Sequence, residues 1–466
     1  MLISFATLVL LAIWVALGVW GVTLLLSRPR ARWLGAALVV EAALAVVAQV
    51  ALSTIPFGIG EPLIRVKLLQ VVLQATLAFV AVLGVGGLVY VAGRTWSTRL
   101  EHGRRLFKFA ALLVAVPLVA SGSLYGLAQA SLPPRERERD PSKRSIKLPQ
   151  GFSWSIYAEG TMDNPTTMTF GPDKKLYIGD ISGTLWVATD SKGTCKVDSI
   201  KRFADGFTLL LGLAWHGNEL YVASAGKIEA LRDTKGTGVA DQRRVVVQGL
   251  PSMVLMPHSN NGIAFGPDGR LYFGVGSTSE GQVEQNDHAA AVLSVKPDGS
   301  DLRVFARGFG NPFDIAFNRE GQLFGGDNSP QGEGEDPPDE YNHIVEGGHY
   351  GFPYFYGDPP DNGGTIGAMV TFPPHATPTG TTFYVGNTYP PEYRDSAFVA
   401  LWNRGEIARV EVARAPSGNY LGHATTFGSG FLYPIAVTNG PDGNLYVADF
   451  GTSAIYRITY DPNKAY

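Results

Sequence analysis

One short pattern, repeated along the second part of the chain, constrains the fold more than any other feature of the sequence. Each copy has an apolar triplet, a turn, the pair Leu-Tyr or Leu-Phe, and a further β-type run. In the GPDG form of the turn, Pro presets φ, Asp caps the neighbouring backbone, and Gly accepts the left-handed conformation that closes a hairpin. The clear copies are MTFGPDKKLYIGD (Met168–Asp180), LAWHGNELYVAS (Leu213–Ser224), IAFGPDGRLYFGVG (Ile263–Gly276), IAFNREGQLFGGD (Ile315–Asp327) and VTNGPDGNLYVAD (Val437–Asp449).

The spacing of these copies predicts the architecture. Counted from the residue before the turn, the first four copies follow one another at 46, 49 and 52 residues. A gap of 122 residues before the last copy leaves room for one degenerate unit, and TTFYVGNTYPPEYRDSAFVALW (Thr381–Trp402) fits that place. Six units of four strands each predict an all-β six-bladed propeller over residues 151–466. The loops at one end of a propeller surround its central channel, so we expect the functional site there.

The beginning of the chain has a different texture. Four apolar segments there each approach the ~20 residues that span a bilayer, which predicts four transmembrane helices over residues 1–132. A cleaved signal peptide is the alternative for the first segment, but its N-terminus has no positive charge and three more segments follow. A linker with prolines and mixed charge, residues 133–150, then leads to the propeller. The apolar segments are Ile3–Leu26, Trp33–Thr54, Leu68–Val91 and Phe109–Ala128.

Charge and cysteine content narrow the function further. Basic residues gather in Arg28–Arg32 and Arg94–Lys108, so the positive-inside rule places both loops in the cytoplasm. We therefore expect a multi-pass protein of the cell membrane, in contact with lipid, with its propeller on the exoplasmic side. A net charge of −3 without a basic tract in the soluble part does not support nucleic-acid binding. The single Cys195 excludes an intrachain disulfide, and no CxxCH motif for a covalently attached haem is present.

Four stretches in the middle of the chain carry a resemblance to a known family. They are HSNNGIAFGPDGRLYFGVGS (His258–Ser277), ARGFGNPFDIAF (Ala306–Phe317), DNSP (Asp327–Pro330) and PPDEYN (Pro337–Asn342). Together they resemble the glucose/sorbosone dehydrogenase family. The resemblance implies a six-bladed propeller outside the cytoplasm that oxidises an aldose or related sugar with pyrroloquinoline quinone (PQQ) and calcium. Electrons would pass to membrane quinone or to an external carrier, because no haem motif is present.

The resemblance also implies roles for two polar residues. His258 matches the family's general base, which takes the proton from the sugar hydroxyl as hydride moves to the quinone. A neutral imidazole suits that role, because its unperturbed pKa lies near physiological pH. A histidine packed in a loop is the alternative. Asn311 matches an asparagine that contacts the cofactor, and a turn residue before Pro312 is its alternative.

A calcium site is implied in the acidic loop that follows the fourth clear repeat. Ser329 and Pro330 fall where family members coordinate calcium through backbone carbonyls. Calcium prefers hard oxygen ligands, so nearby carboxylates suit it as well. A solvated acidic loop is the alternative. The carboxylate candidates are Asp327, Asp339 and Glu340, with Glu333, Glu335 and Asp336 between them.

Three positions depart from the family pattern. Gly310, Asn403 and Phe431 stand where family members carry the cations that hold the quinone. PQQ has three carboxylates, so each missing cation removes a charge-assisted partner. Arg307 and Arg404, both close in sequence to these positions, are the candidates to contact the cofactor in their place.

These departures leave two further functions open. One is a propeller that has lost the cofactor and binds a glycan or a protein partner. The other is a calcium-dependent, lactonase-like hydrolase, which shares the architecture and needs no quinone-binding cations. His258 and the acidic loop favour the dehydrogenase, whereas the missing cations favour the other two functions.

Overall fold

The computed structural model describes residues 138–252, 258–279, 281–330, 337–358, 363–416 and 418–464. The chain divides into two compact units, Met1–Arg137 and Glu138–Tyr466, and the described residues all belong to the second. The four predicted transmembrane segments and the start of the predicted linker lie outside them. Within the described residues, no helix has both the length and the apolar character needed to cross a membrane.

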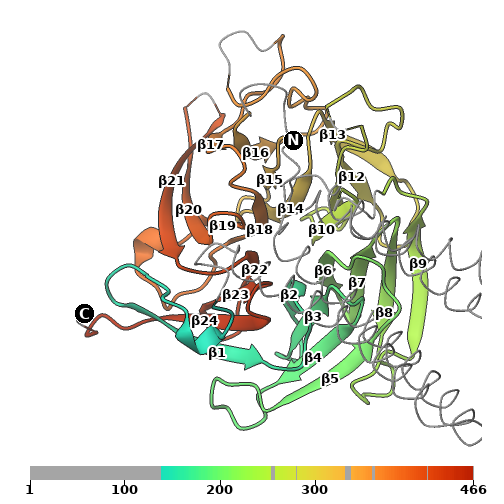
Figure 1. The fold of residues 1–466 in the computed structure, drawn as a ribbon. Helices are drawn as coiled ribbons and strands as arrows, with labels where there is room; N and C mark the ends of the chain where they lie inside the picture. The colour runs from blue at the N-terminus through green and yellow to red at the C-terminus, as the bar shows by residue number, and fades with distance from the viewer. Residues whose placement is uncertain are drawn as a thin grey trace, which may run out of the picture. The chain divides into compact units, whose positions relative to one another are not determined.

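The described residues form six four-stranded antiparallel sheets arranged as blades around a common centre (Figure 1). The predicted six-bladed β-propeller is therefore confirmed, and each of the six repeat copies supplies the first two strands of one blade. The described residues also include two short 3₁₀ helices, η2 (Pro141–Lys143) before the first blade and η3 (Pro391–Tyr393) in the loop between the first two strands of blade five.

Each blade consists of four strands, named below from the innermost to the outermost. Blade one is β2 (Pro165–Phe170), β3 (Leu176–Asp180), β4 (Leu185–Thr189) and β5 (Ser199–Ala204). Blade two is β6 (Gly212–His216), β7 (Glu219–Ser224), β8 (Lys227–Arg232) and β9 (Gln242–Gln248). Blade three is β10 (Asn260–Phe265), β11 (Leu271–Val275), β12 (Ala291–Val295) and β13 (Arg303–Arg307). Blade four is β14 (Pro312–Phe317), β15 (Leu323–Asp327), β16 (Asp339–Ile344) and β17 (Val370–Phe372). Blade five is β18 (Pro378–Phe383), β19 (Ala397–Leu401), β20 (Glu406–Arg414) and β21 (Tyr420–Ser429). Blade six is β22 (Pro434–Asn439), β23 (Leu445–Asp449), β24 (Ala454–Tyr460) and β1 (Phe152–Glu159).

Blade six closes the ring with strands from both ends of the propeller. Its outer strand β1 comes first in the sequence and pairs antiparallel with the last strand β24, from Phe152 opposite Tyr460 to Glu159 opposite Ala454. In Figure 1 the teal β1 lies beside the red β24. The repeat predicts the blades, but this closure joins residues about 300 positions apart, and no local pattern reports it.

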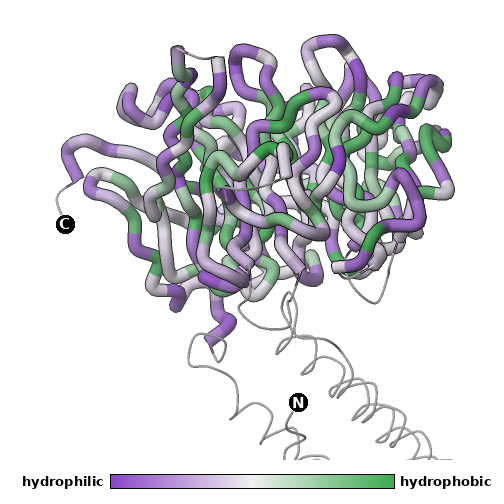
Figure 2. The backbone as a smooth tube through the Cα atoms, turned by 90° about the horizontal axis from the view of Figure 1, so that it is seen from above, coloured by the Kyte–Doolittle hydropathy of each residue, from purple (hydrophilic) through white to green (hydrophobic). Residues whose placement is uncertain are grey.

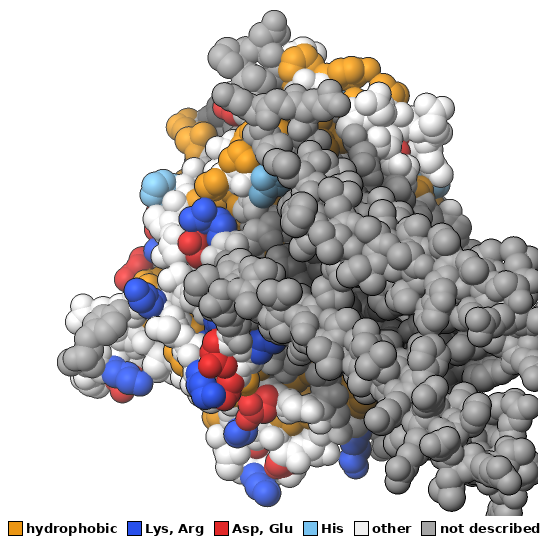
Figure 3. Space-filling model, viewed as in Figure 1, with side chains coloured by type: hydrophobic (Ala, Val, Ile, Leu, Met, Phe, Trp, Pro, Cys, Tyr) orange, Lys and Arg blue, Asp and Glu red, His pale blue; other side chains and the backbone are white. Residues whose placement is uncertain are grey.

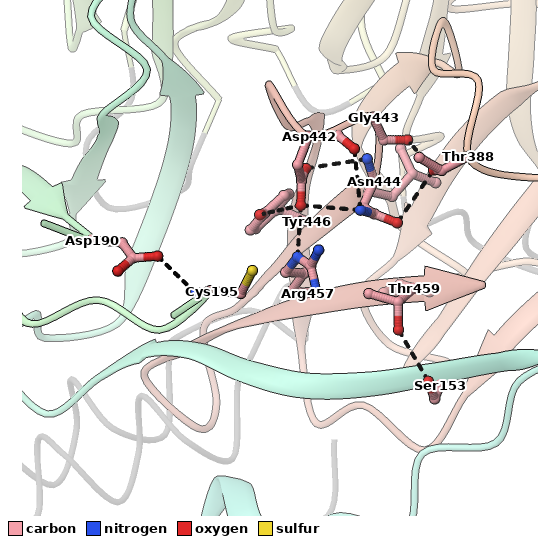
Figure 4. A network of polar contacts seen from close by, with 12 residues as sticks. Ser153, Asp190, Cys195, Thr388, Asp442, Gly443, Asn444, Tyr446, Arg457 and Thr459 are labelled. Carbon is pink, nitrogen blue, oxygen red and sulfur yellow. Dashed lines mark hydrogen bonds and ion pairs between the residues drawn. The ribbon is translucent and has the colours of Figure 1, made fainter. Parts of the chain in front are cut away.

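The repeated turn has a structural cause that is visible in Figure 4. In blade six, the Asp442 carboxylate accepts the Tyr446 hydroxyl at 3.1 Å and Arg457 Nε at 2.7 Å. The same bond joins the turn aspartate to the tyrosine of Leu-Tyr in two more blades, Asp173 with Tyr177 at 3.2 Å and Asp268 with Tyr272 at 2.9 Å. The glycine that opens each of these turns lies so close to the tyrosine ring that a Cβ would collide with it. The motif therefore pins the tyrosine over its own turn.

The leucine of the same pair supplies the cores between the blades. Leu176, Leu220, Leu271 and Leu445 are completely buried, and so is the residue two positions later on each strand. In Figure 2 the hydrophobic parts of the backbone tube run through the body of the propeller, while hydrophilic stretches dominate the loops. Because successive strand residues face opposite sides, each blade packs apolar side chains against both neighbours.

The last part of the predicted linker packs on the propeller. Lys147 and Ser429 exchange backbone hydrogen bonds of 2.9 and 3.0 Å. The guanidinium of Arg144 is buried and donates to the carbonyls of Gly430 at 2.7 Å and Phe431 at 3.1 Å. Its positive charge also lowers the pKa of the buried Asp449 carboxyl, against the larger rise that burial causes. Arg144 thus anchors this segment between blades five and six.

We expect Arg144→Leu to lower the free energy of unfolding by about 2–4 kcal/mol, because buried carbonyls lose their donors and Asp449 loses a nearby cation. The thermal unfolding midpoint of the full chain measures the effect. Lys143→Leu is the matched control, since the Lys143 side chain is 65% exposed and its ion pairs are at the surface. Its expected change is below ~0.5 kcal/mol. Equal losses in the two variants would contradict the anchoring role.

Candidate functional site

Strand direction places those predicted site residues that the structure describes at one end of the propeller. Strands alternate in direction within a blade, so the loops that join consecutive blades emerge at the same end as the loops between second and third strands. The repeated Gly-Pro-Asp turns lie at the opposite end. We call the first end the loop face. On the part of it visible in Figure 3, acidic and basic side chains stand beside one another rather than in a broad patch of one sign.

His258 lies in the loop between β9 and β10 and is partly buried. Its Nδ1 is 2.9 Å from the carbonyl oxygen of Ser277, in the loop between β11 and β12. Because a carbonyl only accepts, Nδ1 carries the proton in this contact, and Nε2 is the acceptor nitrogen of the neutral ring. The histidine is therefore held in the tautomer that a base acting through Nε2 requires.

Asn311 lies beside His258, and a hydrogen-bond chain fixes the orientation of its amide. Asn261 Nδ2 donates to the carbonyl of Pro312 at 3.1 Å, which settles the orientation of the Asn261 amide. The same Nδ2 donates to Asn311 Oδ1 at 2.8 Å. Asn311 Nδ2 then points elsewhere, completely buried and without a hydrogen-bond partner among the described residues. A Cβ on Gly276 would fall 2.5 Å from Asn311 Oδ1 and 3.1 Å from His258 Cα, so both residues flank this glycine.

Several other buried polar atoms lack a partner among the described residues. Both side-chain atoms of Asn328, which follows β15, are unpaired, and so is Nε1 of Trp402, which follows β19. Buried polar groups are nearly always hydrogen-bonded, so such atoms on the loop face indicate a missing polar partner. Donors of this kind fit the oxygens of a quinone or a carboxylate.

Gly310, Asn403 and Phe431, the positions at which the resemblance implies cations, make other contacts in this structure. A side chain on Gly310 would collide with the carbonyl oxygen of Asn328, so an arginine cannot be restored there without moving the backbone. Asn403 Nδ2 donates to Thr377 Oγ1 at 2.9 Å. Phe431 is completely buried and packs its ring against Tyr456. None of these three residues carries a positive side chain, so none supplies the cation that the resemblance implies there.

The two candidate arginines lie on different blades and are paired at the surface. Arg307 ends the outer strand β13, with its side chain 53% exposed and 3.6 Å from the Asp287 carboxylate. Arg404, in the turn between β19 and β20, pairs with Glu406 at 3.0 Å. Their predicted contact with a cofactor stays a prediction, and it would require both to exchange their present partners.

The predicted metal carboxylates meet at one corner of blade four. Asp327 ends β15 directly opposite Glu340 of β16. Burial raises the pKa of both carboxyls; the Glu340 charge raises that of Asp327 further, and the Asp339 charge raises that of Glu340. Burial also raises the pKa of Asp339 to about 6. This corner stabilises protonated carboxyls or a bound cation, because several buried negative charges cannot stand together unneutralised.

Much of the hydrogen-bonding capacity of these carboxylates is already engaged. Asp327 accepts the backbone N–H groups of Gly310 at 2.9 Å and Asn311 at 2.7 Å. Asp449, at the same place in blade six, accepts two backbone N–H groups in the same way, so this aspartate has a structural role in the repeat. Asp339 accepts Ser329 N at 2.9 Å and Thr377 N at 2.7 Å.

Calcium binding at this corner stays a prediction. Across the described ranges, no group of three or more His, Cys, Asp or Glu side chains has the arrangement of a metal site. Ser329 and Pro330 lie next to the corner, and the Ser329 hydroxyl donates to the Pro338 carbonyl at 2.6 Å. The three other predicted carboxylates, Glu333, Glu335 and Asp336, lie outside the described residues.

One polar residue of the inner ring was not singled out by the sequence motifs. Asp314 lies on β14, the innermost strand of blade four, and its side chain keeps partial exposure. One of its oxygens accepts Thr381 N of the next blade at 3.0 Å. Burial raises its pKa to about 7. At this position the six blades carry Thr167, Gly212, Gly262, Asp314, Gly380 and Ala436. Asp314 is the charged residue among these six, and an alignment of the repeat copies could have singled it out.

Comparison with known proteins agrees with the fold. Residues 138–349 match DUF7133, a domain of unknown function. An uncharacterized protein of Borreliella burgdorferi is 26% identical over 355 residues, covering 68% of this chain and 91% of that protein. Quinoprotein glucose dehydrogenase B of Acinetobacter calcoaceticus is 24% identical over 316 residues, covering 56% of this chain and 62% of the enzyme.

Solved structures extend the comparison. The crystal structure of a putative oxidoreductase (glucose dehydrogenase) from Thermus thermophilus superposes with a TM-score of 0.56 at 25% identity, covering 66% of this chain and 100% of that one. At 16–19% identity, where likeness shows the fold alone, the matches include a PQQ-bound aldose sugar dehydrogenase and a calcium structure of a carbohydrate-active enzyme. The described part of the chain is thus a six-bladed propeller of the kind found in PQQ-dependent glucose and aldose sugar dehydrogenases.

Proposed function

We propose that this chain is a sugar dehydrogenase that uses PQQ and oxidises an aldose or related hydroxyl. One observation carries the proposal: the buried, unpaired Nδ2 of Asn311 lies beside His258, whose tautomer is set by the Ser277 carbonyl. The loop face therefore holds a proton acceptor next to a donor directed at an absent partner. The quinoprotein and glucose dehydrogenase relatives supply the reaction class.

The residues have separate roles in this proposal. Bound PQQ would supply the electron acceptor for the hydride of the sugar. His258 would accept the proton of the sugar hydroxyl at Nε2. Asn311, oriented by Asn261, would donate to an oxygen of the quinone or of one of its carboxylates. Burial strengthens such a bond, because the donor otherwise remains unsatisfied.

Calcium at the corner of Asp327, Asp339 and Glu340 belongs to the same proposal. A divalent cation would neutralise carboxylates whose pKa values burial and mutual repulsion now raise. We also propose that the first unit anchors the propeller in the cell membrane on its exoplasmic side. Electrons would then pass to membrane quinone or to an external carrier.

A second candidate is favoured by the neutral residues at Gly310, Asn403 and Phe431. A propeller that has lost the cofactor would bind a glycan or a protein partner at the same loop face. PQQ carries three carboxylates, so a site with fewer cations binds it more weakly. The affinity for PQQ therefore distinguishes the dehydrogenase from the binding protein. The lactonase-like alternative would need several oxygen ligands for its calcium at the site. At the equivalent position of the six innermost strands, Asp314 is the one carboxylate, so the carboxylates there give this alternative no support.

Titration of the purified full chain with PQQ, in calcium and then in chelator, tests the proposal through the absorbance of the bound quinone. We expect saturable binding that weakens in chelator, and dye-linked oxidation of at least one aldose. Asn311→Asp should weaken binding by roughly 10–100-fold, because a carboxylate oxygen then replaces the outward N–H group and repels an anionic cofactor. Asn318→Asp, in a turn at the opposite end of the propeller, is the matched control. If the wild type does not bind PQQ, the dehydrogenase proposal is wrong and the second candidate, binding of a glycan or a protein partner, replaces it.

A further inference from the structure

Glu284, in the loop beside His258, accepts hydrogen bonds from several neighbouring groups. Its Oε1 accepts the Ser277 hydroxyl at 2.5 Å, Thr278 N at 2.9 Å and Ser279 N at 3.1 Å. Its Oε2 accepts the Thr278 hydroxyl at 2.7 Å. Burial alone would raise the pKa of Glu284, but these hydrogen bonds outweigh it and hold the pKa below its ordinary value. The carboxylate is therefore charged at neutral pH and organises residues 277–279.

One peptide group lies between this carboxylate and the histidine. The peptide that joins Ser277 to Thr278 has its N–H bonded to Glu284 Oε1 at 2.9 Å. Its carbonyl oxygen is the one that contacts His258 Nδ1 at 2.9 Å. Both polar ends of one rigid, planar unit are thus engaged, one by an anion and the other by the imidazole. An anion at the N–H end polarises the peptide and makes its carbonyl a stronger acceptor.

We infer that Glu284 is a positioning residue for His258, acting through the Ser277–Thr278 peptide, so that carboxylate, peptide and imidazole form one hydrogen-bonded relay. The inference rests on the proposed role of His258 as base. A base that takes up a proton becomes an imidazolium, and its Nδ1–H then binds the polarised carbonyl more strongly. The relay supplies what a carboxylate bonded directly to a histidine supplies, without placing a second charge beside the anionic cofactor.

Further hydrogen bonds fix the backbone on either side of the Ser277–Thr278 peptide. Ser277 N donates to the Gly310 carbonyl at 2.7 Å, and Gly276 N donates to the Ser259 carbonyl at 3.0 Å. Among the described residues, the other charged or titratable groups on neighbouring elements include Lys227 of β8, Asp287 and His288 of the same loop, Arg307, His349 and Asp327. Asp287 faces Arg307, His349 contacts the backbone of Gly308, and Asp327 accepts from residues 310 and 311. Glu284 is the group whose hydrogen bonds reach the peptide.

The test follows the imidazole of His258 in the full chain without quinone or sugar. Long-range ¹H–¹⁵N spectra of histidine-labelled protein report the tautomer and the pH midpoint of each ring, with His258→Gln assigning the signal. We expect the Nδ1–H tautomer in the wild type. Glu284→Gln removes the charge and should lower the midpoint by ~0.5–1 pH unit, because the imidazolium loses its distant anion. In active protein, the acid limb of the rate profile should move the same way, with roughly 10-fold loss at its plateau.

Asp287→Asn is the matched control, since it removes a carboxylate from the same loop whose side chain is 89% exposed. Solvent screening should limit its shift to ~0.2 unit. Ser277→Ala, which removes only the hydroxyl contact, should give a smaller shift in the direction of Glu284→Gln and serves if that variant does not fold. An unchanged tautomer and midpoint in a folded Glu284→Gln variant would overturn the relay. A shifted midpoint in a chain that binds no PQQ would retain the relay and reject the proposed function.

Discussion

His258→Ala should lower the rate of sugar oxidation by ~10²–10⁴-fold in the PQQ-loaded chain, which is the usual cost of losing a positioned general base. The expected loss lies in kcat, because the imidazole accepts its proton as hydride leaves rather than when the sugar binds. The thermal midpoint should change little, since His258 is only partly buried and lies in a loop. Initial rates of dye reduction over a range of sugar and PQQ concentrations measure the effect.

Two controls separate lost chemistry from lost structure. His423→Ala, on the exposed outer strand β21, should retain wild-type rates. Added imidazole should restore part of the rate of His258→Ala, because the removed ring leaves space for a diffusible base. A His258→Ala variant that oxidises sugar within about threefold of the wild type, a margin far below the ~10² expected, would show that the base lies elsewhere.

Asp314→Asn should markedly change how the stability of the folded chain depends on pH. Burial raises the pKa of Asp314 to about 7, whereas an unfolded aspartate titrates near 3.8. Between these values the folded chain holds a proton that the unfolded chain releases, so stability falls as pH rises. The full shift corresponds to about 4 kcal/mol, an upper bound because the side chain keeps partial exposure to solvent. This stabilisation is fully lost only when the pH rises above the pKa of Asp314 in the folded chain.

Unfolding by denaturant from about pH 4 to pH 8.5 measures this dependence. In Asp314→Asn we expect the decline with rising pH to shrink by ~1–3 kcal/mol, leaving a remainder from Asp327, Asp339 and Glu340, whose pKa values burial also raises. Asp205→Asn is the matched control, because its side chain is 57% exposed and should leave the slope unchanged. Parallel stability curves for wild type and Asp314→Asn would show that Asp314 stays ionised in the folded chain.

The sequence by itself determined the number and the order of the blades. The reason is local: Gly-Pro-Asp turns and the Leu-Tyr pair make their contacts within a few residues, as the Asp442–Tyr446 bond shows. This bond recurs in three of the blades. The apolar triplet, turn and Leu-Tyr or Leu-Phe pair recur in the five clear copies and can be counted. The motif resemblance likewise located the loops of His258 and Asn311, and the structure brings both residues close to Gly276.

Only the tertiary structure decided which atoms these residues present. The Asn311 amide is oriented by Asn261, which lies 50 residues earlier on another blade, and Arg144 reaches carbonyls 286 residues away. Glu284 contacts His258 through the Ser277–Thr278 peptide, and the orientation of that peptide cannot be predicted from the pattern of side chains. Hydrogen-bond orientation depends on backbone geometry across blades, so a motif can place a residue in a loop without determining which of its atoms faces the site.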